Sequence, residues 1–345
     1  MTEPLRPIEW TGSSIRVLDQ TALPSGLVYV SLERVEQLVD AISRLAVRGA
    51  PQLGAVGALG VVLAMDQAER EAWDWLQLQA AVQEIRGARP TAVNLAWGVD
   101  RVRPLMAQGR DAVLEAAQAI VADDERINRA IGRHGADWIE ARVPGRVRVL
   151  THCNTGALAT TAWGTALGII RELWARGTLE VVFADETRPL LQGARLTAWE
   201  LAQDGIPHFV QADGAAASTI LRGLVDVAII GADRIAANGD TANKIGSLGL
   251  ALACKDAGIP FIVAAPESTV DVSTASGDDI EIEMRGEAEV LSFAGVRVAP
   301  EASRAHNPAF DVTPARLISA LVTEDGVFAV DEGQTPAARL SDVPR

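Results

Sequence analysis

The stretch Val225-Asp-Val-Ala-Ile-Ile-Gly-Ala-Asp-Arg234 decides how the rest of the chain can be arranged. It begins as an apolar run rich in Val and Ile, which is typical of a strand buried on both faces of a parallel sheet. Asp233 and Arg234 follow this run directly, where the strand should end. Ligands of open α/β sheets bind just outside the carboxyl ends of the strands. A carboxylate at that position therefore indicates either a ligand site or a salt-bridged strand end.

Polar residues continue after this strand as far as Asn243 and Lys244, and a helix-like run from 245 to 257 follows them. We expect both residues in the loop that leaves the strand, on the same side of the sheet as Asp233. An amide and an ammonium group beside a carboxylate could bind a polar substrate. The alternative is an ordinary polar loop exposed to water.

The rest of the second half alternates between apolar runs and helical patterns. We predict strands at 147–151, 179–184, 208–211, 225–231 and 260–265, with helices at 158–176, 190–203, 215–224 and 245–257. A short helix at 315–322 and a strand at 326–330 would close the unit. Such alternation predicts an α/β domain with a Rossmann-like parallel sheet and helices on both faces, over residues 144–345. The first strand is not followed by GxGxxG, so a dinucleotide site has no support.

The first part of the chain, residues 1–143, predicts a smaller and mainly helical domain that begins with a short antiparallel sheet. The expected strands are 15–18 and 27–31. A first helix should begin near residue 31, and further helices should cover 51–64, 67–86, 93–108 and 111–140. The stretch Val143-Pro-Gly-Arg146 marks the predicted domain boundary, because proline and glycine interrupt both helices and strands.

Composition restricts the function. The formal net charge of −14 over 345 residues argues against binding to nucleic acid or to an anionic membrane. An uninterrupted apolar run of about 18 residues and a signal peptide are both lacking, so we predict a cytoplasmic protein. Cys153 and Cys254 fit a reducing compartment, and the spacing of Cys and His suggests no metal site. A local pocket of Arg and Lys could still bind an anionic substrate.

A second polar stretch, Thr151-His-Cys-Asn-Thr-Gly156, follows the first strand of the predicted sheet. Cys153 would lie at the carboxyl end of that strand and before a helix N-terminus, which stabilises a thiolate. Asp233 ends another strand of the same sheet, so the two side chains could face one cavity as an acid/base pair. The alternative for Cys153 is a small buried hydrophobe. His152 should point to the opposite face, which argues against a Cys-His dyad.

Further polar residues lie at predicted turns. Gly49 lets the chain turn and a proline two residues later suits a helix start, so free N–H groups beside Arg48 could hold a phosphate. The alternative is a joint between helices with a solvated Arg48. Arg89 precedes a proline, which disfavours helix and places this Arg at a turn. Gln192 lies near a helix start and could donate a hydrogen bond to a substrate hydroxyl.

Six motifs carry a resemblance to a known family. They are Arg48-Gly-Ala-Pro-Gln-Leu-Gly, Thr151-His-Cys-Asn-Thr-Gly-Ala-Leu-Ala-Thr160, Asp185-Glu-Thr-Arg-Pro-Leu-Leu-Gln-Gly-Ala-Arg-Leu-Thr197, Gly231-Ala-Asp-Arg, Asn243-Lys-Ile-Gly-Ser and Asn307-Pro-Ala-Phe-Asp-Val-Thr-Pro. Together they closely resemble the methylthioribose-1-phosphate isomerases, in order over about residues 8–330. The family belongs to a superfamily with ribose-1,5-bisphosphate isomerases and regulatory subunits of the translation initiation factor that exchanges guanine nucleotide. Gln52-Leu53 replaces the commoner Ala-Ile of the first motif.

The resemblance implies a homodimeric, metal-free enzyme without a cofactor that converts 5-methylthioribose 1-phosphate to 5-methylthioribulose 1-phosphate in methionine salvage. By motif, it implies Cys153 and Asp233 as the catalytic pair. The implied substrate-binding residues are Arg48, Gly49, Ala50, Arg89, Gln192, Asn243 and Lys244. Three alternatives remain open: the same chemistry on 5-deoxyribose 1-phosphate, the same chemistry on ribose 1,5-bisphosphate, or a non-catalytic regulatory subunit. A regulatory subunit would not need both Cys153 and Asp233.

Overall fold

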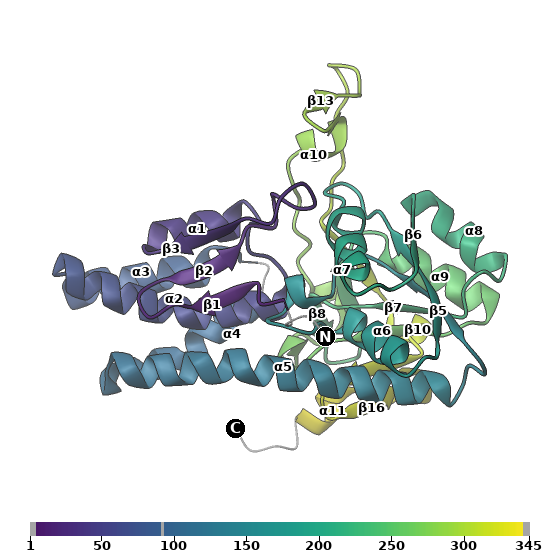
Figure 1. Cartoon of the computed structure of the whole chain (residues 1–345), viewed down its shortest axis with the longest axis horizontal. Helices are drawn as coiled ribbons and strands as arrows, with labels where there is room; N and C mark the ends of the chain where they lie inside the picture. Colours follow the sequence, from purple (N-terminus) through teal and green to yellow (C-terminus); the bar gives the residue numbers. More distant parts are fainter. Residues whose placement is uncertain (1–4, 91–92, 341–345) are drawn as a thin grey trace.

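The structure is a computed structural model that describes residues 5–90 and 93–340 (Figure 1). The chain begins with a three-stranded antiparallel sheet in the order β1-β2-β3. Its strands are β1 (Ile8–Trp10), β2 (Ile15–Leu18) and β3 (Tyr29–Leu32). This is the short sheet that the sequence predicts.

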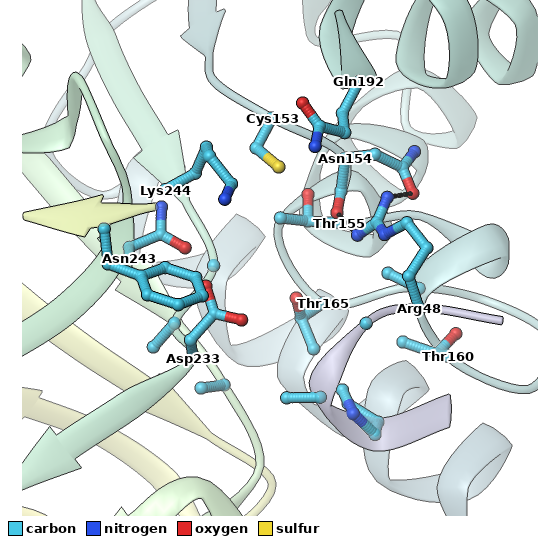
Figure 2. A pocket seen from close by; sticks show the side chains of 18 of the residues that line it. Arg48, Cys153, Asn154, Thr155, Thr160, Thr165, Gln192, Asp233, Asn243 and Lys244 are labelled. Atoms are coloured by element: carbon cyan, nitrogen blue, oxygen red, sulfur yellow. Dashed lines mark hydrogen bonds between the residues drawn. The ribbon is translucent and has the colours of Figure 1, made fainter. Parts of the chain in front are cut away.

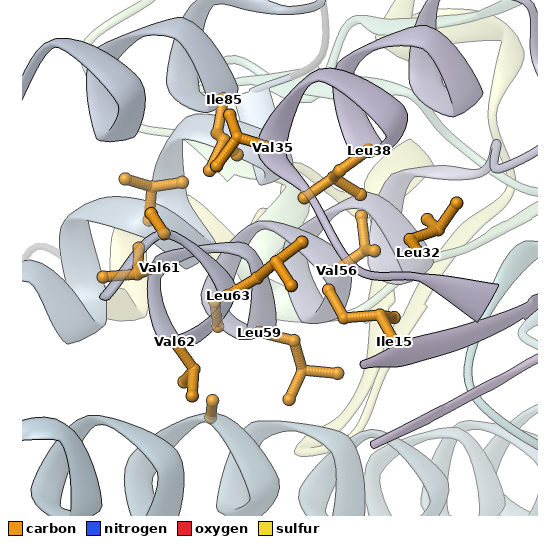
Figure 3. Packing of buried hydrophobic residues seen from close by; sticks show 14 of the residues in the cluster. Ile15, Leu32, Val35, Leu38, Val56, Leu59, Val61, Val62, Leu63 and Ile85 are labelled. Atoms are coloured by element: carbon orange, nitrogen blue, oxygen red, sulfur yellow. The ribbon is translucent and has the colours of Figure 1, made fainter. Parts of the chain in front are cut away.

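Helices follow this sheet. They are α1 (Val35–Ser43), α2 (Ala50–Glu71), α3 (Trp75–Gly87), α4 (Val93–Val102) and α5 (Arg110–Glu140), with a 3₁₀ turn at Arg103–Gln108. Every residue of α2 from Gln52 to Ala64 is buried, which makes this helix the centre of the first hydrophobic core (Figure 3). The prediction of a single helix at 67–86 is wrong, because the end of α2 and most of α3 share these residues. Ala72 adopts the left-handed conformation and ends α2, and Asp74 caps α3 by accepting from the Gln77 N–H.

The long helix α5 runs beneath both halves of the molecule (Figure 1). It packs against α2 in the first half and against the first helix and last strands of the second half. The predicted boundary at residue 143 follows the end of α5, and it stays a prediction.

The second half is built on a seven-stranded sheet in the order β16-β15-β10-β7-β4-β5-β6. All neighbouring pairs are parallel except β15 and β16. The strands are β4 (Val147–Thr151), β5 (Leu179–Asp185), β6 (His208–Gln211), β7 (Val227–Ile230), β10 (Phe261–Ala264), β15 (Ala320–Thr323) and β16 (Gly326–Ala329). Separate hydrophobic clusters cover its two faces. This is the Rossmann-like sheet that the alternating pattern predicts.

Helices connect these strands. They are α6 (Ala166–Ala175), α7 (Ala198–Gln203) after a π turn at Gly193–Thr197, α8 (Ala216–Leu221) and α9 (Ser247–Ala257). The helix predicted at 158–176 begins only at Ala166. A 3₁₀ turn at Ala157–Ala159 and a loop precede it.

The strand order reverses at the centre of the sheet. The chain runs outward from β4 through β5 to β6, then returns to β7 on the other side of β4. The carboxyl ends of β4 and β7 therefore meet at the topological switch point, where open α/β sheets leave a crevice for ligands.

A small four-stranded sheet in the order β11-β8-β9-β14 was not predicted. Its strands are β8 (Arg234–Ala236), β9 (Thr241–Lys244), β11 (Val270–Asp271) and β14 (Phe310–Thr313). The prediction of a helix at 315–322 is also wrong, because these residues form a 3₁₀ turn at Ala315–Leu317 and then the start of β15.

Between β11 and β14 the chain projects from the body as an arm that carries α10 (Ala288–Leu291), β12 (Ser292–Phe293) and β13 (Val296–Arg297) (Figure 1). A last helix, α11 (Pro336–Leu340), lies near the end of the described chain. Among the described residues, no helix is both long and apolar enough to cross a membrane.

Candidate active site

One pocket lies at the switch point of the large sheet, between the carboxyl ends of β4 and β7 and the start of α2 (Figure 2). All nine residues singled out from the sequence line it: Arg48, Gly49, Ala50, Arg89, Cys153, Gln192, Asp233, Asn243 and Lys244. Further lining residues, to which the sequence analysis assigned no role, include Asn154, Thr155, Thr160, Thr165, Arg285 and Phe310. The structure thus brings the predicted residues together from six separate segments of the chain.

Cys153 follows β4 and is 8% exposed. Its backbone is in the left-handed region with φ of +63°, which is unusual for a residue with a side chain. Two hydroxyl groups hold this conformation, since the Cys153 N–H donates to Thr187 Oγ1 at 2.8 Å and Thr197 Oγ1 donates to the Cys153 carbonyl at 2.6 Å. The prediction that a helix begins soon after Cys153 is wrong, because α6 begins only at Ala166. The position of the thiol is therefore set by hydrogen bonds to the backbone of Cys153, and no helix dipole acts on it from α6.

His152 supports the strand end from the other side. Its Nδ1 lies 3.0 Å from Asp185 Oδ2, and its Nε2 lies 2.9 Å from the carbonyl oxygen of Ile245. Both ring nitrogens are thus engaged, as expected from a histidine that does not pair with Cys153. Gly246 with φ of +112° lets the chain pass here, since a Cβ would lie 2.8 Å from the His152 ring. His152 therefore joins the ends of β4, β5 and β9.

His152 also belongs to a group of possible metal ligands that the sequence did not indicate. Its ligand atoms and those of Asp185 and Asp213 lie within 4.8 Å of one another. Hydrogen bonds already engage each of them, because the Asp213 carboxylate accepts from the N–H groups of Thr187 and Arg188 at 2.7 and 2.6 Å. The three side chains hold neighbouring loops in place through these hydrogen bonds.

Arg48 is part of the pocket wall and is not the solvated residue of the alternative interpretation. Its guanidinium donates to Asn154 Oδ1 at 3.0 Å and to the Asn154 carbonyl at 2.9 Å (Figure 2). Asn154 Nδ2 donates in turn to Glu200 Oε1 at 2.8 Å. Glu200 is 1% exposed, accepts from the Ala157 N–H, and pairs with Arg171 at 2.9 Å. A buried ion pair thus fixes the loop after Cys153.

The start of α2 faces the same pocket. Gly49 is its N-cap with φ of +101°, and Gly49 and Ala50 both line the cavity. A Cβ at Gly49 would lie 2.4 Å from the carbonyl oxygen of Ala159, so only glycine lets the helix approach this turn. The first N–H groups of a helix lack partners within the helix and carry a partial positive charge. Such a terminus beside Arg48 is suited to an anion.

Asn243 and Lys244 lie on strand β9, and the prediction that they belong to a loop is wrong. Asn243 Nδ2 donates to Ser247 Oγ at 2.9 Å. Lys244 Nζ donates to the Ala309 carbonyl at 2.8 Å and lies 4.4 Å from the centre of the Phe310 ring. Pairing with β14 therefore aims both side chains more rigidly than a loop would.

Lys244 is 8% exposed, and burial is the main cause that lowers its pKa. The nearby guanidinium groups of Arg89 and Arg285 lower this pKa further, whereas Cys153 and Asp233 raise it. An ammonium group in such surroundings gives up a proton, or binds an anion, more readily than one in water.

Asp233 follows β7, and its N–H donates to the Ala242 carbonyl at 2.9 Å. Figure 2 shows the side chains of Asp233, Cys153 and Lys244 directed toward one central space. Gln192 is 6% exposed, and its Oε1 has no hydrogen-bond partner among the described residues. A buried amide oxygen without a partner is suited to a donor from a ligand. The site can therefore offer an acid, a thiol, cations and an amide to one small polar molecule.

Comparisons with known proteins identify the family of the chain. The model of the initiation factor 2 subunit family matches residues 46–330. A methylthioribose-1-phosphate isomerase of Alkalilimnicola ehrlichii is 50% identical, with 94% of each chain covered. A 5-deoxyribose 1-phosphate isomerase of Moorella thermoacetica is 48% identical, with 100% of both covered. A Nocardia farcinica protein named "Probable bifunctional methylthioribose-1-phosphate isomerase/methylthioribulose-1-phosphate dehydratase" is 50% identical over 99% of this chain, which spans only 63% of that protein.

Solved structures are also similar. The 5-methylthioribose 1-phosphate isomerase of Pyrococcus horikoshii superposes with a TM-score of 0.86 at 38% identity, covering 95% of this chain and 93% of that one. A chain described as translation initiation factor eIF-2B, subunit delta, from A. fulgidus superposes with a TM-score of 0.82 at 38% identity, covering 94% and 96%.

Proposed function

The chain belongs to the initiation factor 2 subunit family, and from this premise we propose that it is an aldose-ketose isomerase acting in methionine salvage. The substrate is 5-methylthio-α-D-ribose 1-phosphate and the product is 5-methylthio-D-ribulose 1-phosphate. Relatives of that name are about half identical over nearly the whole chain. The observation that carries the proposal is a single pocket containing a cysteine and an aspartate at the switch point.

Ring opening is the first chemical difficulty. The anomeric oxygen of this sugar is esterified to phosphate, so the ring cannot open unaided as a free aldose does. The bond between C1 and the ring oxygen must break while the ring oxygen gains a proton. Asp233 acts as that general acid, which requires that its carboxyl group carry a proton before the reaction.

Hydrogen must then move from C2 to C1, so that C2 becomes the carbonyl carbon and C1 becomes a methylene that still carries the phosphate. Cys153 either shuttles this hydrogen as a proton through an enediol-like state or assists its direct shift as a hydride. In both routes the hydroxyl proton of O2 is lost. Cys153 and Asp233 therefore form the catalytic pair.

The remaining residues bind and orient the sugar phosphate. Arg48, Arg89 and Lys244, together with the N–H groups of Gly49 and Ala50, hold the phosphate. Gln192 and Asn243 hydrogen-bond to the sugar hydroxyls. Because remote binding places the reacting carbons beside the catalytic pair, these residues contribute to the rate as well as to affinity.

The second candidate function is the same chemistry on 5-deoxyribose 1-phosphate. The Moorella relative with that name covers the whole of this chain at 48% identity, which favours it over ribose 1,5-bisphosphate. A regulatory subunit of a translation factor is less well supported, because it has no need for Cys153 and Asp233 in one pocket.

The proposal also covers the cellular location, oligomeric state, cofactors and partners of the enzyme. We propose a cytoplasmic homodimer that works on a small sugar phosphate without a metal or cofactor, and that binds neither nucleic acid nor membranes. The net charge of −14 supports the last part, since anionic polymers and surfaces would repel it.

Steady-state kinetics on three sugars test the function. We expect the highest kcat/KM with 5-methylthioribose 1-phosphate, a lower value with 5-deoxyribose 1-phosphate and the lowest with ribose 1,5-bisphosphate. A preference for either of the other two would keep the mechanism and change the substrate. Lack of turnover on all three would contradict the proposal and favour a regulatory subunit.

A further inference from the structure

The arm between β11 and β14 joins the body through two segments of chain that lie side by side (Figure 1). Met284 forms a β-bridge with Pro308, and the Arg285 N–H donates to the Asn307 carbonyl at 2.9 Å. Arg285 lies at this base and lines the pocket. None of the motifs in the sequence includes it. The arm therefore brings one further cation to the site.

Two carboxylates fix the direction of the Arg285 side chain, which is 18% exposed. Glu289 accepts from its Nε at 2.9 Å and from its Nη2 at 2.5 Å, and Glu283 accepts from its Nη1 at 2.9 Å. Asn307 Nδ2 donates to the same Glu289 carboxylate at 3.2 Å. The guanidinium is thus held in a network that resists rotation.

The guanidinium has N–H groups left for a ligand. Arginine carries five N–H donors in one plane, and the bonds to Glu289 and Glu283 use the one on Nε and one on each Nη nitrogen. Among residues 5–90 and 93–340, this leaves one N–H on each Nη nitrogen without a partner. Such charged N–H groups can donate to the oxygens of a phosphate.

The other cations of the pocket lie close to this guanidinium. Arg89 Nη2 lies 3.7 Å from Glu283, the carboxylate that also pairs with Arg285. Arg285 and Arg89 both act on the charge of the buried Lys244, whose pKa they lower. An anion bound among three such groups would relieve their mutual repulsion.

We propose that Arg285 is a further substrate-binding residue, which contacts the phosphate group of the sugar phosphate. This inference rests on the proposed function. Glu283 and Glu289 act as positioning residues that aim the guanidinium. The base of the arm is then a wall of the substrate site, and the arm is more than a surface projection.

The first experiment compares Arg285→Met with Arg304→Met as a matched control. Arg304 lies on the same arm, its side chain is 86% exposed, and it pairs with Glu287 outside the pocket. Isothermal titration measures the affinity for inorganic phosphate, and steady-state kinetics give KM and kcat. We expect Arg285→Met to weaken phosphate binding and raise KM on the order of tenfold or more, with a smaller effect on kcat. Arg285→Lys should restore part of the affinity, and Arg304→Met should match the wild type.

A second variant keeps the test decisive if Arg285→Met does not fold. Glu289→Gln keeps the size of the side chain but replaces one accepting oxygen, which receives hydrogen bonds from Arg285 and Asn307, by an amide donor. We expect it to weaken phosphate binding by roughly two- to threefold, because the guanidinium is then aimed less firmly at the phosphate. A purely structural role of this network would leave the phosphate affinity of the folded variant unchanged.

Unchanged phosphate affinity in folded Arg285→Met would overturn the inference and leave the proposed function intact. Unchanged phosphate affinity in folded Glu289→Gln would overturn the positioning role of Glu289. Failure of the wild-type protein to bind either inorganic phosphate or the sugar phosphate would overturn both the inference and the proposed function.

Discussion

Replacing Gly49 by alanine tests whether the close approach of α2 to the pocket is essential. The added Cβ would lie 2.4 Å from the Ala159 carbonyl oxygen and 2.5 Å from the Ala159 Cα. Ordinary contact begins at 3.4 Å, so the helix start or the turn must move by about 1 Å. The residues of both segments line the pocket, and such a displacement would misplace the substrate.

Two terms contribute to the loss of stability. A side chain at φ of +101° costs about 1–3 kcal/mol of backbone strain. The overlap with the Ala159 backbone adds about 1–3 kcal/mol of overpacking. Gly109 provides a matched control, since it caps α5 with φ of +103° and a Cβ there would meet nothing within 4 Å. Gly109→Ala should therefore show the strain without the overlap.

Denaturant unfolding and kcat/KM are measured on both variants. We expect Gly49→Ala to be less stable than Gly109→Ala by about 1–3 kcal/mol. Its kcat/KM should fall about 100-fold, because a 1 Å misplacement of bound substrate has an effect of that order. Equal stability and equal activity of the two variants would refute the reasoning, since the approach of α2 to the turn would then not matter.

Three further predictions concern carboxylates. Asp233→Asn should lower kcat by about 100-fold or more while titration still detects the substrate; retained turnover would contradict its role as the acid. Burial raises the pKa of Asp124 to about 6, so the folded state holds this proton more tightly than the unfolded chain. Wild-type unfolding free energy should therefore fall by about 2 kcal/mol more than that of Asp124→Asn as the pH rises from 4 to 7, and equal slopes would refute this. Glu200→Gln leaves the buried Arg171 short of one partner and should lower the unfolding free energy by about 3 kcal/mol. An unchanged denaturation midpoint would show that this ion pair does not support the loop after Cys153.

The large sheet could be predicted because its strands are continuous apolar runs. Residues 227–230 are buried on all sides, as the Val and Ile content of this stretch indicates. The approximate positions of Cys153 and Asp233 follow from the same pattern, since each comes directly after such a run. Hydrophobic patterning thus determines which strand ends meet at the switch point.

The small sheet could not be predicted in this way. The sequence Thr241-Ala-Asn-Lys244 has no apolar alternation, and it forms a strand because Phe310–Thr313 pairs with it from far along the chain. Arg285 was missed for a related reason, because only tertiary folding brings the base of the arm to the pocket. Local propensity carries no signal of such pairings.

The loop after Cys153 shows the same limit. The helical pattern at 158–176 is interrupted in the structure because distant groups bind its first part. The Asp124 carboxylate of α5 accepts from the Thr161 N–H at 2.7 Å, and Glu200 accepts from the Ala157 N–H at 2.7 Å. Buried hydrogen bonds to carboxylates from elsewhere outweigh the weak helical preference of these residues.

Proton and phosphorus NMR of the purified protein with 5-methylthioribose 1-phosphate tests the central claim most directly. The account predicts that the aldose signals give way to those of 5-methylthioribulose 1-phosphate, with the phosphate still attached to C1. It also predicts that Cys153→Ser loses this conversion. Persistence of the aldose with the wild-type protein, or full conversion by the variant, would contradict it.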